Sequence, residues 1–510
     1  MRAHLHFRNG RARRVICIAA GIVLVAGRLM AQSAPEVSGV RIRADMDILA
    51  SDSFGGRKPG TPGERLTTDY IIKQFAGTGL APAAGGGWLQ PVKLEMRRAR
   101  STSLVVRTPG GEATNLGDGV ALVGNAVSVQ LGNVRVVWGG YLRMGGKDLA
   151  GALVLYRDGD PPGMPQPQPT DGITRLGVLA GAGARGALAV VTDEAFVRRK
   201  AALDAGLTTL VSDPGMVVRG VISESAARRV LEAAGQTLAQ LDSAATAPGF
   251  QATLLPQRAD LKVLTEIVAF TSYNVAGLLK GARQPDEYLL YTAHWDSFGS
   301  CRPGQGDEIC NGAIDNASGT AGLIELARAF ASGPRPDRSV LFLATTAEEM
   351  GLAGSRQYAR TPLVPLARTV AEFNLDVIAL YGRGNTAGFV GAGLTDADSV
   401  FGRLVAAQGR QLDTGQLTRM VLRSSDAWSL LVAGVPSFIL SGAIGTGDQG
   451  SKPFHDYLAT RYHQPGDELQ ALVSMEGAVE EVELLYAAGL YYGSAGTRIA
   501  FRPESAFQRR

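Results

Sequence analysis

The sequence predicts an α/β fold built on an open sheet, and three observations support this class. Three mostly apolar runs, at 288–293, 339–347 and 370–375, have the length of buried strands. Segments with a helical pattern lie between them, so strand and helix alternate as βαβ units require. The runs end at His294, Glu348 and Asp376. Ligands of open α/β sheets bind outside the carboxyl ends of the strands, so a site is expected at these residues.

The elements are expected in a regular order. The strand 288–293 is followed by a helix over 319–331, in which apolar residues recur at helical spacing. The strand 339–347 leads through a turn at Gly351 into a helix over 352–359, and the strand 370–375 follows. A last helix is expected over 469–490.

The N-terminus has the pattern of a secretory signal. Five arginines precede an apolar stretch over 15–27, and Leu29-Met30-Ala31 follows it, so cleavage is expected near Ala31. The stretch is too short for a comfortable membrane span. Arg13-Arg14 alone is weak evidence for a twin-arginine signal, and an ordinary signal is preferred. The mature protein is expected to be secreted or periplasmic, with no stable membrane span.

Charge gives no indication of a nucleic-acid partner. The formal net charge of +4 depends on the predicted signal, which holds six of the 51 basic residues and no acidic one. The mature chain would therefore carry 45 basic and 47 acidic residues, which is no basis for nucleic-acid binding. A length of 510 residues exceeds what one core usually serves, so two domains are expected.

Two cysteines remain after removal of the signal, Cys301 and Cys310, in one loop rich in glycine and proline. In an exported protein such a pair favours a disulfide, and two free thiols are the alternative. A zinc site built from them is disfavoured, because no second pair completes it.

Six acidic or histidine side chains have the chemistry of a two-zinc hydrolytic site. In chain order they are His294, Asp315, Glu348, Glu349, Asp376 and His463. Each motif alone has a plainer interpretation: the small-residue turn 312–319 could be a helix entry, and Glu348-Glu349 could be a solvated pair at a strand end. An acid such as Asp376 in an apolar strand is costly without a partner, however, so the set together favours a metal site.

Five motifs in this order resemble those of the co-catalytic zinc aminopeptidases. They are His294-Trp295-Asp296, 312–319, Ala347-Glu348-Glu349-Met350-Gly351, Asn374-Leu375-Asp376 and Tyr462-His463-Gln464-Pro465. The superfamily also holds glutamate carboxypeptidases, glutaminyl cyclases and transferrin receptors. The resemblance implies the zinc-peptidase fold, a three-layer α/β sandwich with a central mixed, mostly parallel sheet. This domain would comprise 37–96 and 259–495, since 49–61 is similar to the opening segment of these domains.

The resemblance implies two zinc ions per chain. One would be held by His294 and Asp376, and the other by Glu349 and His463. Asp315 would bridge both ions, which leaves positions for a water and for the substrate carbonyl.

The resemblance also assigns the residues around the metals. Glu348 would act as general base toward a metal-bound hydroxide, and Asp296 would hydrogen-bond the free ring nitrogen of His294. Tyr462 resembles a tyrosine that steadies the oxyanion, with a packing role as the alternative. In the family, the peptide bond that matches Asp315-Asn316 is typically cis.

Two positions depart from the family pattern. Ser297 and Ala427 stand where relatives commonly have histidines. Neither is a proposed ligand, so the departures put the substrate-facing wall in doubt rather than the metals. His455 is expected in a surface loop.

Residues 97–258 are expected to form an inserted, β-rich domain. Short strand-like runs occur at 134–138, 152–156 and 187–191, with a Pro-rich loop at 161–169 and a small-residue helix at 179–184. The segments 148–155 and 180–187 resemble a protease-associated domain, and an unrelated α/β insertion is the alternative. Residues 496–510 are expected to form a polar tail.

The function implied is that of an exported zinc aminopeptidase acting on peptides. A glutaminyl cyclase and a carboxypeptidase on the same fold remain alternatives, and so does an inactive receptor-like binding protein. The presence of all five ligands and of the base disfavours the inactive alternative.

Overall fold

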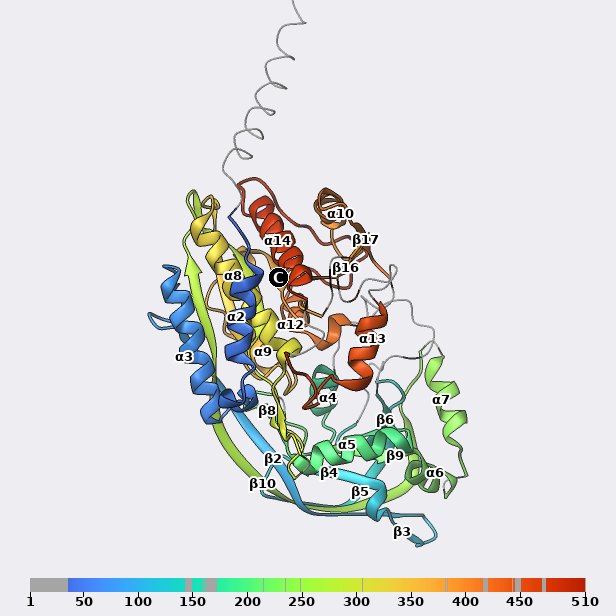
Figure 1. Ribbon diagram of the computed structural model, residues 1–510. Coiled ribbons are helices and arrows are strands. Elements are labelled where there is room, and N and C mark those ends of the chain that lie inside the picture. Colours follow the sequence, from blue (N-terminus) through green and yellow to red (C-terminus); the bar gives the residue numbers. More distant parts are fainter. Residues whose placement is uncertain are drawn as a thin grey trace, which may run out of the picture.

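The computed structural model confirms the predicted α/β class, with a mixed central sheet and helices on both of its faces (Figure 1). It describes residues 35–142, 149–158, 161, 172–213, 215–233, 235–247, 249–304, 306–380, 382, 384–415, 421–442, 444, 451–469 and 474–509. The predicted signal segment and most of the Pro-rich loop lie outside these residues. No helix of the described part is long and apolar enough to cross a bilayer.

The central part of the sheet has the strand order β17-β16-β18-β15-β11-β14-β10. Its core strands β18, β15, β11 and β14 are parallel to one another, while β16 and β10 pair antiparallel at the two sides. The strands are β10 (Thr253–Leu279), β11 (Gln284–His294), β14 (Arg338–Thr345), β15 (Thr369–Asn374), β16 (Thr386–Val390), β17 (Gln411–Asp413) and β18 (Ser437–Ser441).

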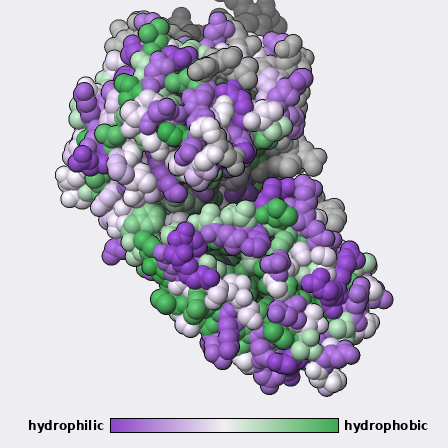
Figure 2. All heavy atoms as spheres, turned by 60° about the horizontal axis from the view of Figure 1, so that its bottom comes forward, coloured by the Kyte–Doolittle hydropathy of each residue, from purple (hydrophilic) through white to green (hydrophobic). Residues whose placement is uncertain are grey.

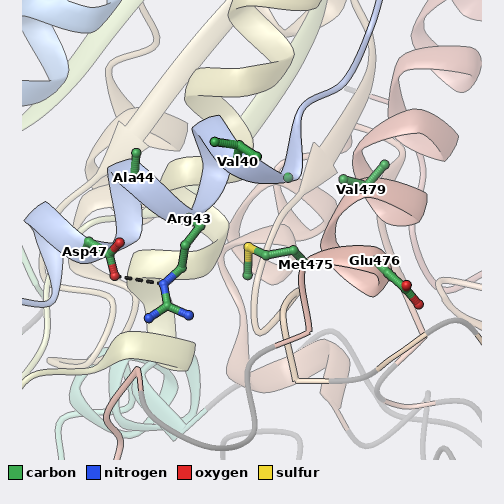
Figure 3. A pocket seen from close by; sticks show the side chains of 8 residues that line it. Val40, Arg43, Ala44, Asp47, Met475, Glu476 and Val479 are labelled. Carbon is green, nitrogen blue, oxygen red and sulfur yellow. Dashed lines mark hydrogen bonds and ion pairs between the residues drawn. The ribbon is translucent and has the colours of Figure 1, made fainter.

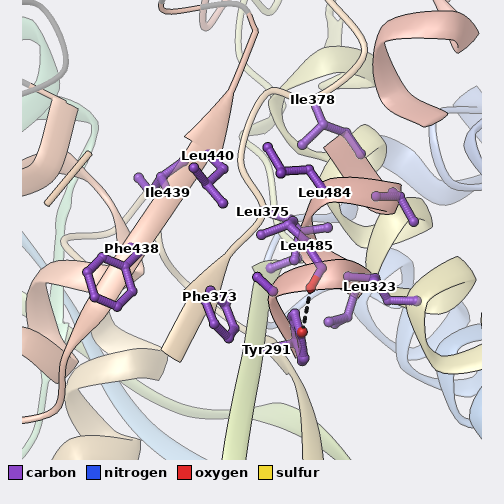
Figure 4. Close-up of a cluster of buried hydrophobic side chains, with 14 of the residues drawn as sticks. Tyr291, Leu323, Phe373, Leu375, Ile378, Phe438, Ile439, Leu440, Leu484 and Leu485 are labelled. Carbon is purple, nitrogen blue, oxygen red and sulfur yellow. Dashed lines mark hydrogen bonds between the residues drawn. The ribbon is translucent and has the colours of Figure 1, made fainter. Parts of the chain in front are cut away.

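The apolar runs form buried strands because both faces of the sheet are covered. In β11, Leu289 and Tyr291 point into one core, where α8 (Gly319–Ser332) and α14 (Met475–Tyr492) pack, and the Tyr291 hydroxyl donates to the Leu485 carbonyl at 2.8 Å (Figure 4). Leu290 points into the opposite core, beneath α9 (Ala353–Arg360) and α12 (Asp426–Val432). This alternation gives three layers, since successive side chains of a strand face opposite sides.

Most predicted helices agree closely with the structure. The helix expected over 319–331 is α8, and the helix expected over 352–359 is α9. The last helix was expected from residue 469, but α14 begins at Met475, where the Ser474 side chain accepts from the Gly477 N–H. A serine in this position caps a helix because it satisfies one of the free N–H groups of the first turn.

The N-terminal part of the predicted catalytic domain packs on the same core. It consists of α2 (Gly39–Leu49), a short 3-10 helix η1 (Asp52–Arg57) and α3 (Pro62–Gly77), and a brief strand β1 (Ala81–Pro82) follows. Ile42 and Met46 of α2 and Phe75 of α3 are fully buried in the core that also contains α8. η1 is thereby held beside the carboxyl ends of the strands, next to the hairpin of β12 (Gly299–Ser300) and β13 (Ile309–Cys310).

The predicted inserted block continues the central sheet. β2 (Leu89–Arg107) and β10 pair along most of their length and curve from the upper part of the molecule to its base (Figure 1). The expected boundaries at 96/97 and 258/259 fall inside these two strands. The block nevertheless has cores of its own, built around Trp138, Leu188 and Val154. A recess separates its surface from the upper part, and hydrophilic and hydrophobic residues are interspersed over both (Figure 2).

The block contains the strands that the sequence predicted. Residues 134–138, 152–156 and 187–191 coincide with β5, β6 and β7, while the helix expected at 179–184 instead ends at Gly181. Its elements are β3 (Ala113–Asn115), β4 (Val120–Gly124), β5 (Ser128–Trp138), β6 (Leu153–Arg157), α4 (Gly172–Gly181), β7 (Gly186–Val191), α5 (Asp193–Ala205), β8 (Leu207–Leu210), β9 (Val218–Ser223), α6 (Glu224–Glu232) and α7 (Leu238–Thr246).

The C-terminal residues differ from the expected polar tail. Ile499 and Phe507 are buried, and the Phe507 ring packs edge-on against Trp428 of α12 at 5.5 Å. Arg509 donates to the carbonyl of Val370 in β15. The segment therefore belongs to the core of the catalytic part, because two apolar side chains anchor it despite its polar composition.

Candidate metal centre

Neighbouring parallel strands deliver three of the predicted site segments to one edge of the sheet. His294 is the last residue of β11, Glu348 and Glu349 follow β14, and Asp376 follows β15. β11 lies between β14 and β15, so their carboxyl ends meet at a single place. The loops that hold the remaining ligands approach this edge from the side.

Asp315 and His463 complete the group from two such loops. Asp315 lies in the turn Ala313–Ser318 ahead of α8, and the bond Asp315-Asn316 is cis, as the resemblance implied. His463 lies in the turn after α13 (Ser451–Thr460) and has a positive φ of 58°. Ala347 and Val377, next to other ligands, also have positive φ. Non-glycine residues in this conformation concentrate at functional sites, where surrounding contacts hold the backbone.

The five predicted ligands form two groups that share Asp315. In the first group, His294 Nε2 lies 3.1 Å from Asp315 Oδ1 and 3.5 Å from Asp376 Oδ1. In the second, His463 Nε2 lies 3.4 Å from Asp315 Oδ2 and 3.0 Å from Glu349 Oε2. The two carboxylate oxygens of Asp315 thus face different groups, as a bridging ligand requires.

These distances fit zinc. Four ligand atoms placed tetrahedrally at roughly 2.0–2.1 Å from an ion lie about 3.3 Å from one another. Four of the donor side chains also have a buried polar atom without a hydrogen-bond partner, which is uncommon in a folded protein. These atoms are His294 Nε2, Glu349 Oε1, Asp376 Oδ1 and His463 Nε2. A cation between them would satisfy them, so the residues present suit a pair of zinc ions.

The electrostatics also favour bound cations. Burial, together with the nearby Asp315 carboxylate, raises the pKa of Glu349 to about 8. Burial alone would lower the pKa of His463, but the carboxylates of Asp315 and Glu349 beside its ring raise it to about 10. The protein without metal therefore holds protons among these acids, and divalent ions would replace the protons.

Glu348 lies beside both groups without belonging to either. Its carboxylate Oε2 is 4.0 Å from His294 Nε2, and its backbone N–H donates to Asp296 Oδ1 at 3.0 Å. Burial is the first cause of a pKa well above the usual range, and the neighbouring carboxylates of Glu349 and Asp376 add to it, although His294 acts in the opposite direction. A buried carboxylate with a raised pKa next to a metal site is suited to accept and return a proton.

Asp296 differs in detail from the prediction. The Nδ1 atom of His294 lies 3.2 Å from the backbone carbonyl oxygen of Asp296, whereas the Asp296 carboxylate is 3.7 Å away. A proton on Nδ1 donated to this carbonyl leaves Nε2 free for a metal. The carboxylate instead accepts from the Glu348 N–H, so Asp296 joins the His294 loop to the loop of Glu348.

Tyr462 lines the cavity beside the metal groups. Its ring stacks on the His463 ring at 3.5 Å, and it packs against the central core. The cavity has a volume of about 280 Å³ and also contains Asp315, Glu348 and Asp376 on its polar side. His455, expected in a surface loop, is exposed but lies on α13.

The cysteines form a disulfide next to the site. Cys301 and Cys310 are bonded across the short hairpin of β12 (Gly299–Ser300) and β13 (Ile309–Cys310). Phe298 precedes this hairpin, and its ring lies 4.5 Å from the ring of His463. The hairpin thus borders the second metal group.

The two family departures lie in different surroundings. The Ser297 hydroxyl donates to the Cys310 carbonyl at 3.2 Å, so it supports the hairpin. Ala427 is fully buried in α12 within the central core. Its neighbour Asp426 is also buried and accepts a hydrogen bond from Thr345, at the end of β14.

Asp467 supports the site, but we did not predict it. Its carboxylate accepts from the N–H groups of Ile314 and Asp315 at 3.1 and 3.0 Å, and from the Tyr457 hydroxyl at 3.0 Å. It is almost fully buried. The only signal in the sequence was its place four residues after His463.

A larger surface groove is lined by residues other than these ligands. It lies between α2 and α14, has a volume of about 830 Å³ and is lined by Val40, Met475 and Val479 (Figure 3). It contains none of the predicted site residues, so its size does not mark it as the site of chemistry.

Comparison with known proteins identifies the matching segment. Residues 274–487 match the model of peptidase family M28. Aminopeptidase NAALADL1 of Mus musculus is 37% identical over 139 residues, which are 26% of this chain and 17% of that protein. Aminopeptidase YwaD of Bacillus subtilis (strain 168) is 37% identical over 111 residues, 21% of this chain and 22% of that protein. The matches therefore span less than a quarter of either relative.

A solved structure extends the likeness to most of the chain. An aminopeptidase from Aneurinibacillus sp. strain AM-1 superposes with a TM-score of 0.54, covering 93% of this chain and 98% of its own. At 20% identity this likeness establishes the fold alone. With the family match, the predicted resemblance to the zinc aminopeptidases is confirmed, and the predicted class of enzyme, a metallopeptidase, is supported.

Proposed function

We propose that this protein is an exported zinc aminopeptidase that hydrolyses N-terminal residues from peptides. The observation that carries the proposal is the pair of three-donor groups that share Asp315, with Glu348 beside them in the wall of a cavity. Such paired sites serve hydrolytic enzymes that act on amide or phosphate bonds.

Each residue has one task in this proposal. His294 and Asp376 hold one zinc ion, Glu349 and His463 hold the other, and Asp315 bridges the two. When bound, the ions supply Lewis acidity, which acidifies a water and polarises the scissile carbonyl.

Glu348 supplies the proton transfer. Its carboxylate takes a proton from the attacking water and returns it to the departing amine nitrogen, so the peptide bond breaks without a free amide anion. The hydrogen bond from its backbone N–H to Asp296 holds the loop in position for this step. The Tyr462 hydroxyl is proposed to stabilise the oxyanion, with its ring oriented by stacking on His463.

The charge of the cavity favours a free amine over a free carboxylate. Its described lining contains the carboxylates of Asp315, Glu348 and Asp376 and no lysine or arginine. The zinc ions would offset the charges of Asp315 and Asp376, which leaves the Glu348 carboxylate to attract an N-terminal ammonium, and no side-chain cation of the described lining would pair with a C-terminal carboxylate. This distinction supports aminopeptidase over carboxypeptidase action.

The other wall indicates the kind of N-terminal residue. Apolar side chains from four segments line it, including Val377, Ile439, Ile444 and Phe454. We therefore propose that the cavity accepts an apolar N-terminal side chain, since burial of such a side chain is favourable.

Export is proposed from the predicted signal, and the disulfide is consistent with an oxidising compartment. The inserted block is proposed to be a protease-associated domain. Because its surface borders a recess beside the catalytic part, it would limit the size of the substrate.

Metal content and substrate range test the proposal together. The purified mature protein should hold two zinc ions per chain and cleave apolar N-terminal residues from peptides with a free amine. Matched peptides with an acetylated N-terminus should not be cleaved. One zinc ion with cyclisation of N-terminal glutamine would indicate a glutaminyl cyclase instead, and cleavage of blocked peptides from the C-terminus a carboxypeptidase. Absence of metal and turnover would leave a receptor-like binding protein.

Two variants separate the roles of metal ligand and base. Glu348→Gln should keep both metals and lose turnover by about 10²–10⁴-fold, the range typical of general base catalysis. Asp315→Asn should lose metal, because the amide that replaces the bridging carboxylate is uncharged and has only one oxygen to offer. A fully active Glu348→Gln enzyme would overturn the assignment of the base.

A further inference from the structure

Arg57 is fully buried, yet no carboxylate of the described residues lies within ion-pair distance of it. Four backbone carbonyl groups accept its hydrogen bonds instead. Nε donates to Trp295 at 2.7 Å, Nη2 to Gly312 at 2.8 Å, and Nη1 to both Leu49 and Asn311 at 2.8 and 2.6 Å. A buried charge is costly unless it is hydrogen-bonded, so this arrangement requires a specific reason.

Three of the four carbonyl groups come from the loops that carry two metal ligands, and the fourth, that of Leu49, ends α2. Trp295 directly follows His294, and Asn311 and Gly312 lie just ahead of Asp315. The guanidinium group is planar and rigid, so hydrogen bonds to both loops set the distance between them. His294 Nε2 and Asp315 Oδ1, the ligand atoms on the two loops, are 3.1 Å apart.

The backbone before Arg57 is shaped for this close approach. Gly55, Gly56 and Arg57 all have positive φ, at 57°, 64° and 47°. A Cβ atom on Gly56 would lie 2.5 Å from the Cys310 carbonyl oxygen and 2.8 Å from Gly299 Cα. Only glycine at position 56 lets the segment come this near to the disulfide hairpin. Arg57 itself has a left-handed conformation, which a non-glycine residue adopts at a cost in free energy.

The charge of Arg57 also suits its location. Burial lowers its pKa to about 10, and the carboxylates of Asp467, Asp296, Asp315 and Glu349 act in the opposite direction. The side chain therefore stays positive at neutral pH, and its charge offsets part of the repulsion among these acids.

We propose that Arg57 is a positioning residue of the metal centre, a brace that holds the loop after His294 and the loop before Asp315 at the separation that zinc requires. The inference rests on the proposed zinc centre. It gives a role to the segment 49–61, which the proposed reaction otherwise leaves without one.

The test compares two fully buried arginines. Arg338 begins β14, is equally buried, and donates to the carbonyls of Tyr492 and Ser494 and to Glu287, away from the metal groups. Arg57→Met, Arg57→Lys and the same two substitutions at Arg338 are prepared. Zinc affinity is measured by chelator competition, and thermal unfolding is measured in EDTA so that metal does not contribute.

Both Arg57 variants should bind zinc roughly 10- to 100-fold more weakly, the range seen when partners of metal ligands are removed. Lysine keeps the charge but cannot reach all four carbonyls, so it should restore only part of the affinity. The Arg338 variants should unfold at lower temperature while their folded fraction binds zinc as the wild type does.

Unchanged zinc affinity in a folded Arg57 variant would overturn the inference, and so would an equal loss of affinity in the Arg338 variants. Should Arg57→Met fail to fold, Arg57→Lys decides the question by the same criterion. A wild-type protein without tightly bound zinc would instead refute the proposed function, so the two failures are distinguishable.

Discussion

The carboxylate of Asp467 should contribute strongly to stability even in the absence of metal. It accepts three hydrogen bonds from buried donors: the N–H groups of Ile314 and Asp315 and the Tyr457 hydroxyl. Asp467→Ala leaves all three donors without this acceptor, at about 1–3 kcal/mol each. Burial, together with repulsion from the Asp315 carboxylate, raises the pKa of Asp467 to about 6. Removal of the Asp467 carboxylate relieves this repulsion. We expect a net loss of about 3–5 kcal/mol in the free energy of unfolding.

Urea unfolding in EDTA, followed by tryptophan fluorescence, measures this loss without a contribution from metal. Glu468→Ala is the matched control, because the adjacent Glu468 carboxylate accepts a single hydrogen bond, from Asn311, and is only half-buried. It should cost no more than about 1 kcal/mol. A change of less than about 1 kcal/mol in Asp467→Ala, or equal changes in the two variants, would refute the reasoning.

Burial raises the pKa of Glu481 on α14 to about 8, so the folded protein retains a proton that the unfolded chain releases near pH 4.5. Stability should fall as pH rises between these values, by at most about 1.4 kcal/mol per pH unit, and Glu481→Gln should flatten this slope in urea titrations while the exposed Glu476→Gln does not. Loss of the Cys301–Cys310 disulfide through Cys301→Ser should lower the free energy of unfolding by about 2.5–3 kcal/mol, and dithiothreitol should destabilise the wild type but not the variant. The carboxylate of Asp213 in the inserted block accepts from two arginines of α9. Asp213→Ala should therefore lower the free energy of unfolding by about 2 kcal/mol or more and accelerate proteolysis between β8 and β9. Unchanged proteolysis would argue against this contact.

Several features of the fold were predictable because they depend on local pattern. The apolar runs that end at His294, Glu348 and Asp376 became adjacent parallel strands, since a run of that length buried on both faces has few alternatives. The domain boundaries were not predictable in this way. β10 continues for 27 residues through both blocks, so no change of pattern marks where one core ends and the next begins.

The sequence by itself determined the chemistry of the site: which side chains can bind zinc, in which order they occur, and which of them lie at strand ends. Only the tertiary structure decided how they are held. Arg57 contacts backbone carbonyls and Asp467 contacts backbone N–H groups, and every residue offers such groups, so no residue type in the sequence identifies the partner. Ligand identity is a property of side chains, whereas positioning depends on which distant segments the packed core brings together.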